Sequence, residues 1–194
     1  NADSAARIAE HSGDANMELE PEGLRYLSRN DTRRAARAFR EAIALRPDRP
    51  AAYANLGSAL QNSGHYVEAA QRFLEAKERC PVDSEVWAEA TARAFVMLTQ
   101  DACAEVAKPE WWNDKGLKAL SARVVRAAPD SVPAHQMRAF VLSMRCCASA
   151  WEAGPRSAAE LREAAQCSEL AAALSPAPVM KAQSVSYTHL RAHE

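Results

Sequence analysis

One proline-terminated motif occurs twice in the first half of the chain. Two segments share the pattern A-x3-F-x2-A-x4-P, namely Ala35, Phe39, Ala42 and Pro47 and then Ala69, Phe73, Ala76 and Pro81. At this spacing the alanines and the phenylalanine share one face of a helix, where small side chains let a second helix approach and the phenylalanine fills the gap. Proline then ends the helix. The pattern predicts repeated pairs of packed helices.

The composition favours helices and excludes two classes of partner. The 194 residues include 43 Ala but only 13 Ile and Val together and 6 Gly, whereas strands are enriched in β-branched and aromatic residues and depleted in Ala. Lys and Arg number 24 against 25 Asp and Glu, so no net positive charge recruits nucleic acid or an anionic membrane surface. No apolar run approaches the roughly 20 residues that span a bilayer. We expect neither a nucleic-acid nor a membrane partner.

The residues between the two motifs complete one repeat unit. After Pro50 come Tyr53, Leu56, Gly57, Leu60, a Ser-Gly turn and Tyr66. With the Ala, Phe, Ala and Pro positions, this order resembles the tetratricopeptide repeat, a helix-turn-helix unit of about 34 residues. The resemblance implies an all-α fold in which the repeats stack as a solenoid, an α-α superhelix. Each pair is too small to bury its own apolar face, so neighbouring repeats must cover it.

The predicted array covers residues 16–183, and its repeats differ in length. The resemblance is strong up to residue 83 and looser beyond it. There the closing prolines, Pro129 and Pro176, come much later than the interval from Pro47 to Pro81 predicts. We assign the extra residues to insertions at 101–112 and 144–156. The predicted segments are an N-terminal segment 1–15, repeats 16–49, 50–83, 84–131 (extended) and 132–178 (extended), and a truncated fifth repeat 179–183.

Residues 184–194 are interpreted as foreign to the protein. The last ten, VSYTHLRAHE, lack the alanine-rich helical periodicity of the preceding chain. They resemble the translation of a sequencing adapter, the transposon-end adapter of tagmentation libraries. We therefore exclude the segment from arguments about the fold and expect the genuine chain to be truncated at about Gln183. The alternative is a natural polar tail.

The sequence contains no recognisable catalytic or metal-binding motif. The histidines before residue 184, His11, His65 and His135, have no cysteine or second histidine at metal-ligand spacing. No phosphate-binding glycine motif and no nucleophile elbow occurs. The five cysteines include no C-x-x-C pair, which favours reduced thiols in a cytosolic or nuclear protein, and we expect a cytoplasmic one. Cys146 and Cys147 are interpreted as buried small side chains, with a redox or thiol-metal pair as the alternative. We predict a noncatalytic protein with no cofactor and no metal.

The resemblance implies a concave groove, lined by the first helix of each repeat, that receives extended or helical peptides. Carried over to this chain, the inward positions are Asn55, Ser58, Gln61, Asn62, Glu89, Phe95, Gln136, Phe140 and Met144. The polar residues are suited to bond a peptide backbone, and the phenylalanine and methionine residues to hold an apolar anchor side chain. The alternative is that Phe95, Phe140 and the methionines pack against the insertions.

One known class of ligand is expected not to bind this groove. A branch of the family binds the acidic C-terminal tails of heat-shock chaperones through Lys, Asn and Arg side chains. At the matching positions this chain has Glu20, Leu24, Asn55, Glu85 and Glu89. Three carboxylates there would repel an acidic tail, so we predict no binding of such a tail.

A tryptophan pair stands out in the first insertion. Trp111 and Trp112 follow Lys108-Pro109-Glu110, and Trp151 lies in the second insertion. A tryptophan pair before a helix is interpreted as packing that fixes the connection to the array. The alternative is an exposed aromatic platform for a partner.

Taken together, the residues favour a noncatalytic scaffold. The leading hypothesis is a protein that binds a protein or peptide segment along its concave groove. The rival hypothesis is the targeting array of a larger enzyme or co-chaperone, for example a glycosyltransferase, with a catalytic domain beyond the fragment.

Overall fold

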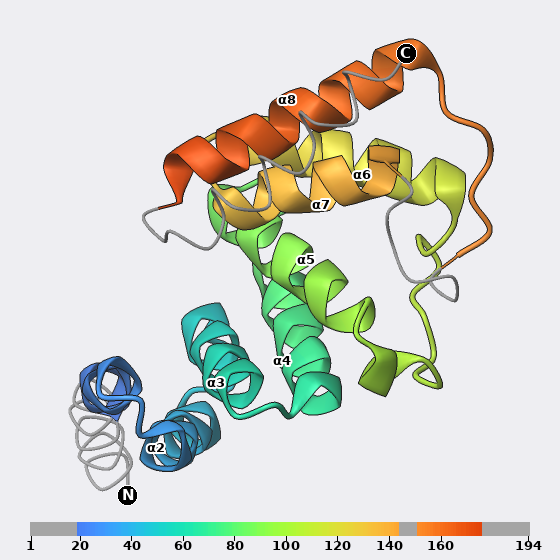
Figure 1. Ribbon diagram of the computed structural model, residues 1–194. Helices are drawn as coiled ribbons and strands as arrows, with labels where there is room; N and C mark the ends of the chain where they lie inside the picture. The colour runs from blue at the N-terminus through green and yellow to red at the C-terminus, as the bar shows by residue number, and fades with distance from the viewer. Residues whose placement is uncertain (1–18, 144–150, 176–194) are drawn as a thin grey trace, which may run out of the picture. The chain divides into compact units, whose positions relative to one another are not determined.

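The computed structural model describes residues 19–143 and 151–175, and these contain helices and connections but no β-strand (Figure 1). The chain divides into two compact units, Asn1–Cys80 and Pro81–Glu194. We call them unit 1 and unit 2 and describe each by itself. The predicted all-α class of helix-turn-helix repeats is confirmed. The predictions for Met144, Cys146, Cys147 and the segments 1–15, 179–183 and 184–194 lie outside the described residues.

In unit 1, three helices follow the helical residues 19–28 along the chain. These are α2 (Thr32–Leu45), α3 (Pro50–Asn62) and α4 (Tyr66–Arg79), and α3 packs against both α2 and α4. The carboxylate of Asp31 caps α2 by accepting a hydrogen bond from the Arg34 amide, and Pro50 begins α3, where its missing N–H costs nothing. The helices therefore start where local chemistry favours a start.

Two glycine-phenylalanine contacts form the interior of unit 1. A Cβ built on Gly57 would lie 2.9 Å from the Phe73 ring, and one on Gly23 would lie 2.6 Å from the Phe39 ring. Both rings are fully buried. Glycine is needed at these positions because any larger side chain would displace the ring. The repeated motif thus encodes a close contact between the two helices of each repeat.

The turns of unit 1 repeat as well. Asn30 and Gly64, at equivalent positions of the two repeats, adopt left-handed φ angles of 60° and 80°. In each turn the next residue donates its amide to a carbonyl five positions back, Asp31 to Tyr26 at 2.9 Å and His65 to Leu60 at 2.9 Å. This is the Schellman closure of a helix, which favours Gly or Asn. The same turn therefore reverses the chain in both repeats.

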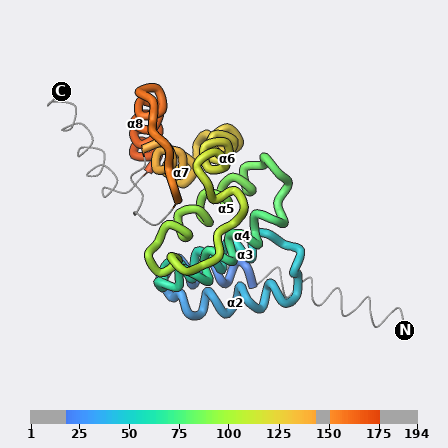
Figure 2. Tube along the Cα trace, turned by 90° about the vertical axis from the view of Figure 1, so that its right-hand side faces the viewer, coloured from blue at the N-terminus to red at the C-terminus, as the bar shows by residue number. Residues whose placement is uncertain are grey.

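Unit 2 contains α5 (Glu85–Leu98), the short 3-10 helix η1 (Asp101–Cys103), α6 (Asp114–Ala127), α7 (Val132–Ser143) and α8 (Ala158–Leu174). α7 packs against α5, α6 and α8, and Figures 1 and 2 both show α6, α7 and α8 side by side. Ser84 caps α5, and Ser157 forms a reciprocal capping box with Glu160 at the start of α8.

The glycine-phenylalanine contact has no counterpart at the matching positions of unit 2. Aligning the repeats on the aromatic residue of their first helices places Thr91 at the position of Gly57. Aligning them on the closing prolines places Ser121 at the position of Phe73, and the Thr91 and Ser121 side chains are both fully buried. Arg138 of α7 fills part of this region, where its Nη1 donates to the Ser121 hydroxyl at 3.1 Å. Small hydroxyl side chains therefore stand where unit 1 has glycine and phenylalanine, with the Thr91 hydroxyl bonded to the Trp87 carbonyl of its own helix and Ser121 bonded to α7.

Candidate functional site

Four of the predicted groove residues lie on α3. Asn55, Ser58 and Asn62 share one helix face because they are three and four positions apart, and Gln61 adjoins Asn62. Asn55, Ser58 and Gln61 are partly exposed, and Asn62 is exposed. The Ser58 hydroxyl donates to the Ala54 carbonyl at 3.0 Å, whereas the three amide side chains make no hydrogen bond within the described residues. We call these four residues the α3 surface.

The helix of residues 19–28 flanks the start of α3. The Glu20 carboxylate lies 3.4 Å from Nε of Arg49, the residue that precedes α3, so its charge is already paired. Leu24, one turn further along the same helix face, is 46% exposed. Polar amides and an exposed apolar side chain are therefore available within unit 1.

In unit 2 the predicted groove residues fall into two groups. Glu89 is engaged inside the unit, because it accepts hydrogen bonds from Arg93 Nε at 2.7 Å and from the Ser131 hydroxyl. Gln136 of α7 is partly exposed and also has a partner within the structure. Phe140, one turn later on α7, is 40% exposed. Only Phe140 of these three presents a large unengaged surface.

The structure places Phe95 in the interior of unit 2, away from any partner. Its ring is fully buried and packs against Trp112 and Trp151, with ring centroids 5.4 Å and 6.0 Å apart. Trp112 also meets Trp151 edge to face at 5.9 Å and Trp111 at 5.7 Å. For Phe95 the alternative interpretation, packing against the insertions, is the arrangement observed. Sequence periodicity missed this because the insertions that cover the residue have no helical spacing.

Lys108 fixes the same connection electrostatically. Its ammonium donates to the Leu98 carbonyl at 3.0 Å and to the Cys103 carbonyl at 2.6 Å, which closes the end of α5 and of η1. It also lies 5.2 Å from the centre of the Trp112 ring, within the range of a cation-π interaction. Trp111 and Trp112 are both partly exposed. These contacts are those of a packed connection, while the aromatic-platform role stays a prediction.

Two arginines with largely covered side chains, which the sequence pattern did not single out, hold unit 2 together. The Arg156 side chain is 3% exposed and forms a two-pronged ion pair with Asp114, Nη1 to Oδ2 at 3.0 Å and Nη2 to Oδ1 at 2.5 Å. Arg138 pairs with Glu163 of α8 in the same way, at 2.8 and 3.1 Å. No sequence signal marks an arginine as buried when its partner lies so far from it along the chain.

The same network lowers two carboxyl pKa values. Hydrogen bonds from Arg156, the attraction of its charge and Lys118 lower the pKa of Asp114 to about 2, against the effect of burial. Glu160 accepts from Lys118 at 2.7 Å and from Ser157, and its pKa is also lowered to about 2. Both carboxylates are charged and bound, so they stabilise the helices around them.

Within the described residues, nucleophilic and metal-ligating side chains do not come together as a catalytic or metal-binding site. Burial raises the pKa of the Cys80, Cys103 and Cys167 thiols, which keeps them in the unreactive protonated form. His135 is buried and donates from Nε2 to the Pro129 carbonyl at 2.7 Å. The described residues hold no group of three His, Cys, Asp or Glu side chains arranged to bind a metal ion. Among the helices of residues 19–143 and 151–175, none has both the length and the apolar character that crossing a membrane requires.

The comparison with known families rests on the helix pairs of unit 1. Residues 21–84 match the family model described as tetratricopeptide repeat. The matched segment contains both glycine-phenylalanine contacts. Over these residues the chain is similar to tetratricopeptide repeats. A search of curated proteins finds no match to the sequence.

Solved tetratricopeptide-repeat structures extend the likeness in fold to most of the chain. A thermophilic TPR protein of Thermus thermophilus superposes with a TM-score of 0.60 at 16% identity, covering 91% of this chain and 83% of that one. MamA superposes with a TM-score of 0.55 at 15% identity, covering 87% of this chain and 83% of MamA. At such identities the likeness concerns the fold alone.

Proposed function

We propose that this tetratricopeptide-repeat chain is a noncatalytic scaffold that binds an extended segment of a partner protein on the α3 surface. One observation supports this more than any other. The side chains of Asn55 and Gln61 are partly exposed and that of Asn62 is exposed, and none of the three amides makes a hydrogen bond among the described residues. An amide has both a donor and an acceptor, so such a row is suited to pair with a peptide backbone.

The neighbouring side chains define what kind of segment fits. Leu24 offers an apolar contact, and the pairing of Glu20 with Arg49 leaves no free charge at the start of α3. We therefore infer a neutral, extended ligand whose backbone pairs with the amides and whose apolar side chains provide most of the binding energy. In unit 2, the exposed Phe140 is a separate candidate for an apolar contact with a partner.

The test compares two double variants in capture of partners from cell extract. N55A/Q61A removes two amides of the α3 surface, and Q71A/Q166A removes two exposed amides from α4 and α8 as a matched control. We expect N55A/Q61A to reduce recovery of specifically retained proteins at least tenfold, with unchanged helicity in circular dichroism, and the control to retain them. Equal retention by the two variants would refute the role of the α3 surface.

Phe140→Ala tests the contribution of unit 2 separately. Because the side chain is 40% exposed, we expect the variant to fold normally and to weaken capture by less than N55A/Q61A does. Unchanged capture by F140A together with loss by N55A/Q61A would confine the site to unit 1.

A further inference from the structure

One short stretch of unit 1 concentrates positive charge. Residues 25–40 contain six arginines and one acidic residue, Asp31, a net charge of +5 in a chain whose net charge is −1. The arginines are Arg25, Arg29, Arg33, Arg34, Arg37 and Arg40. We call the first four the arginine patch.

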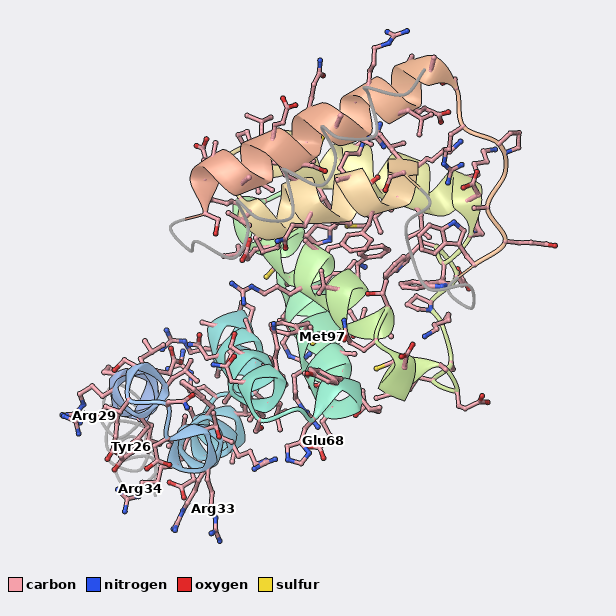
Figure 3. The ribbon with its side chains drawn as sticks, in the orientation of Figure 1. Tyr26, Arg29, Arg33, Arg34, Glu68 and Met97 are labelled. Carbon is pink, nitrogen blue, oxygen red and sulfur yellow. The ribbon has the colours of Figure 1, made fainter. Side chains whose placement is uncertain are left out.

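The turn between the first two helices brings the patch together. The left-handed residue Asn30 and the hydrogen bond from the Asp31 amide to the Tyr26 carbonyl reverse the chain directly after Arg29. The guanidinium of Arg34 consequently lies over the Tyr26 ring, 5.7 Å from its centre. Figure 3 shows Arg29, Arg33 and Arg34 projecting outward around Tyr26. Arg25 precedes Arg29 by one helical turn and shares its face.

Three arginines of the patch have no carboxylate partner among the described residues. Arg34 lies 3.5 Å from Asp31, and beyond the patch Arg37 pairs with Glu41 and Arg40 with Glu68. In contrast, Arg25, Arg29 and Arg33 are exposed and make no ion pair there. The first turn of α2 contains no acidic residue, so Arg33 and Arg34 add their charge to the positive end of the helix dipole. Among the described residues Asp31 offsets part of this charge, at the α2 cap and beside Arg34, and the charges of Arg25, Arg29 and Arg33 stay unpaired.

The surroundings favour carboxylates over nucleic acid as the compensating groups. The carboxylates of Asp31, Glu41 and Glu68 are already taken by Arg34, Arg37 and Arg40, so the three free guanidinium groups need carboxylates from outside. The chain as a whole has a net charge of −1, which gives it no overall attraction for a polyanion such as nucleic acid. We propose that the arginine patch docks an acidic segment, rich in Asp and Glu, of a partner protein. This surface is separate from the α3 surface, so the proposal is independent of the prediction that an acidic chaperone tail does not bind the groove.

The experiment measures binding of a fluorescent deca-glutamate peptide to the full chain at 50 mM salt, with a deca-glutamine peptide as reference. R25Q/R29Q/R33Q neutralises the patch. R46Q/K115Q/R162Q removes the same charge from exposed positions elsewhere. We expect the patch variant to lose at least tenfold in affinity and the control variant less than twofold. Raising salt to 300 mM should weaken wild-type binding severalfold, because exposed charges are screened.

Three results would overturn the proposal. The first is equal binding of the glutamate peptide by the patch and control variants, or none by the wild type. The second is tighter binding of a 20-nucleotide single-stranded DNA that is lost in R25Q/R29Q/R33Q, which would assign the patch to nucleic acid. The third is binding of the glutamate peptide only by the variant D3N/E10Q/D14N/E18Q. That result would show that the acidic N-terminal segment of the chain itself occupies the arginine patch. Circular dichroism of each variant confirms that the helices remain.

Discussion

Both units have apolar interiors, but they differ at one matched pair of positions between helices. In unit 1 a glycine on one helix meets a phenylalanine ring on the next, Gly57 with Phe73 and Gly23 with Phe39. In unit 2 the matching interior contains buried Thr91 and Ser121, and the helices are joined by ion pairs of Arg138 and Arg156. The same architecture is therefore compatible with either an apolar contact or a polar network.

This difference explains where the sequence pattern stops. The tetratricopeptide-repeat model matches residues 21–84, which include both glycine-phenylalanine pairs, while α5 to α8 continue the helices without them. A motif is recognisable when a contact depends on residue size at fixed spacing. A polar network depends on partners at irregular spacing and leaves no such signature.

Phe73→Ala should produce the largest effect and sharpen the comparison. Removing a fully buried ring between α3 and α4 leaves a cavity, and we expect a loss of about 3–5 kcal/mol in the free energy of unfolding. The matching change in unit 2, Ser121→Ala, removes the hydroxyl that accepts from Arg138 and donates to the Lys118 carbonyl, and it should cost about 1 kcal/mol. Urea unfolding followed by circular dichroism measures both. Similar costs would show that the two interiors do not differ as described.

Asp114→Ala tests the network of unit 2. It leaves the guanidinium of Arg156 buried without its carboxylate, which should cost about 3 kcal/mol. The double variant D114L/R156M replaces the pair by apolar side chains and should recover most of that loss. All four tryptophans of the chain lie in unit 2, so their fluorescence reports its unfolding. A double variant as unstable as the single one would contradict the account.

Acid should weaken unit 2 through its bound carboxylates. Folding lowers the pKa of Asp114 and Glu160 to about 2, below their ordinary values near 4. Their stabilisation is therefore complete above about pH 4 and is lost as the pH falls toward 2. The midpoint of urea unfolding by tryptophan fluorescence should fall over this range, and D114L/R156M should reduce the fall. A pH-independent midpoint between 4 and 2 would refute the ion-pair network.

Gly64→Ala should have a smaller effect, confined to the turn of unit 1. Gly64 has a φ of 80° and open space around its Cα, so alanine meets no clash but is strained by about 1–2 kcal/mol. Asn30→Gly in the equivalent turn should change the stability little, because asparagine already tolerates the left-handed region. Thermal unfolding compares the two variants. A stabilising Gly64→Ala would show that the turn is not fixed.

Local chemistry made unit 1 predictable. The repeated A-x3-F-x2-A-x4-P motif located the helix pairs, the buried alanines and both phenylalanines, since each depends on spacing along one helix. The α3 surface followed from the same spacing, and whether it binds a partner stays a prediction. Asn55 and Gln61 were placed on a solvent-facing side of α3 by the same register.

Long-range packing limited prediction in unit 2. Phe95 has the spacing of a groove residue, yet Trp112 and Trp151 from the insertions cover it completely. Glu89 has the same spacing, yet Ser131, which lies beyond the first insertion, engages its carboxylate. Such contacts depend on how irregular connections fold back, and helical periodicity carries no information about that.

Gly57→Ala measured in two backgrounds tests the close helix contact most directly. In the wild type the added Cβ would lie 2.9 Å from the Phe73 ring, so we expect a loss of about 1–3 kcal/mol in the free energy of unfolding. In a Phe73→Leu background the same change should be neutral or stabilise by up to about 1 kcal/mol, as helix propensity alone favours alanine. If Gly57→Ala stabilises the wild type as well, the contact that defines these repeats is absent.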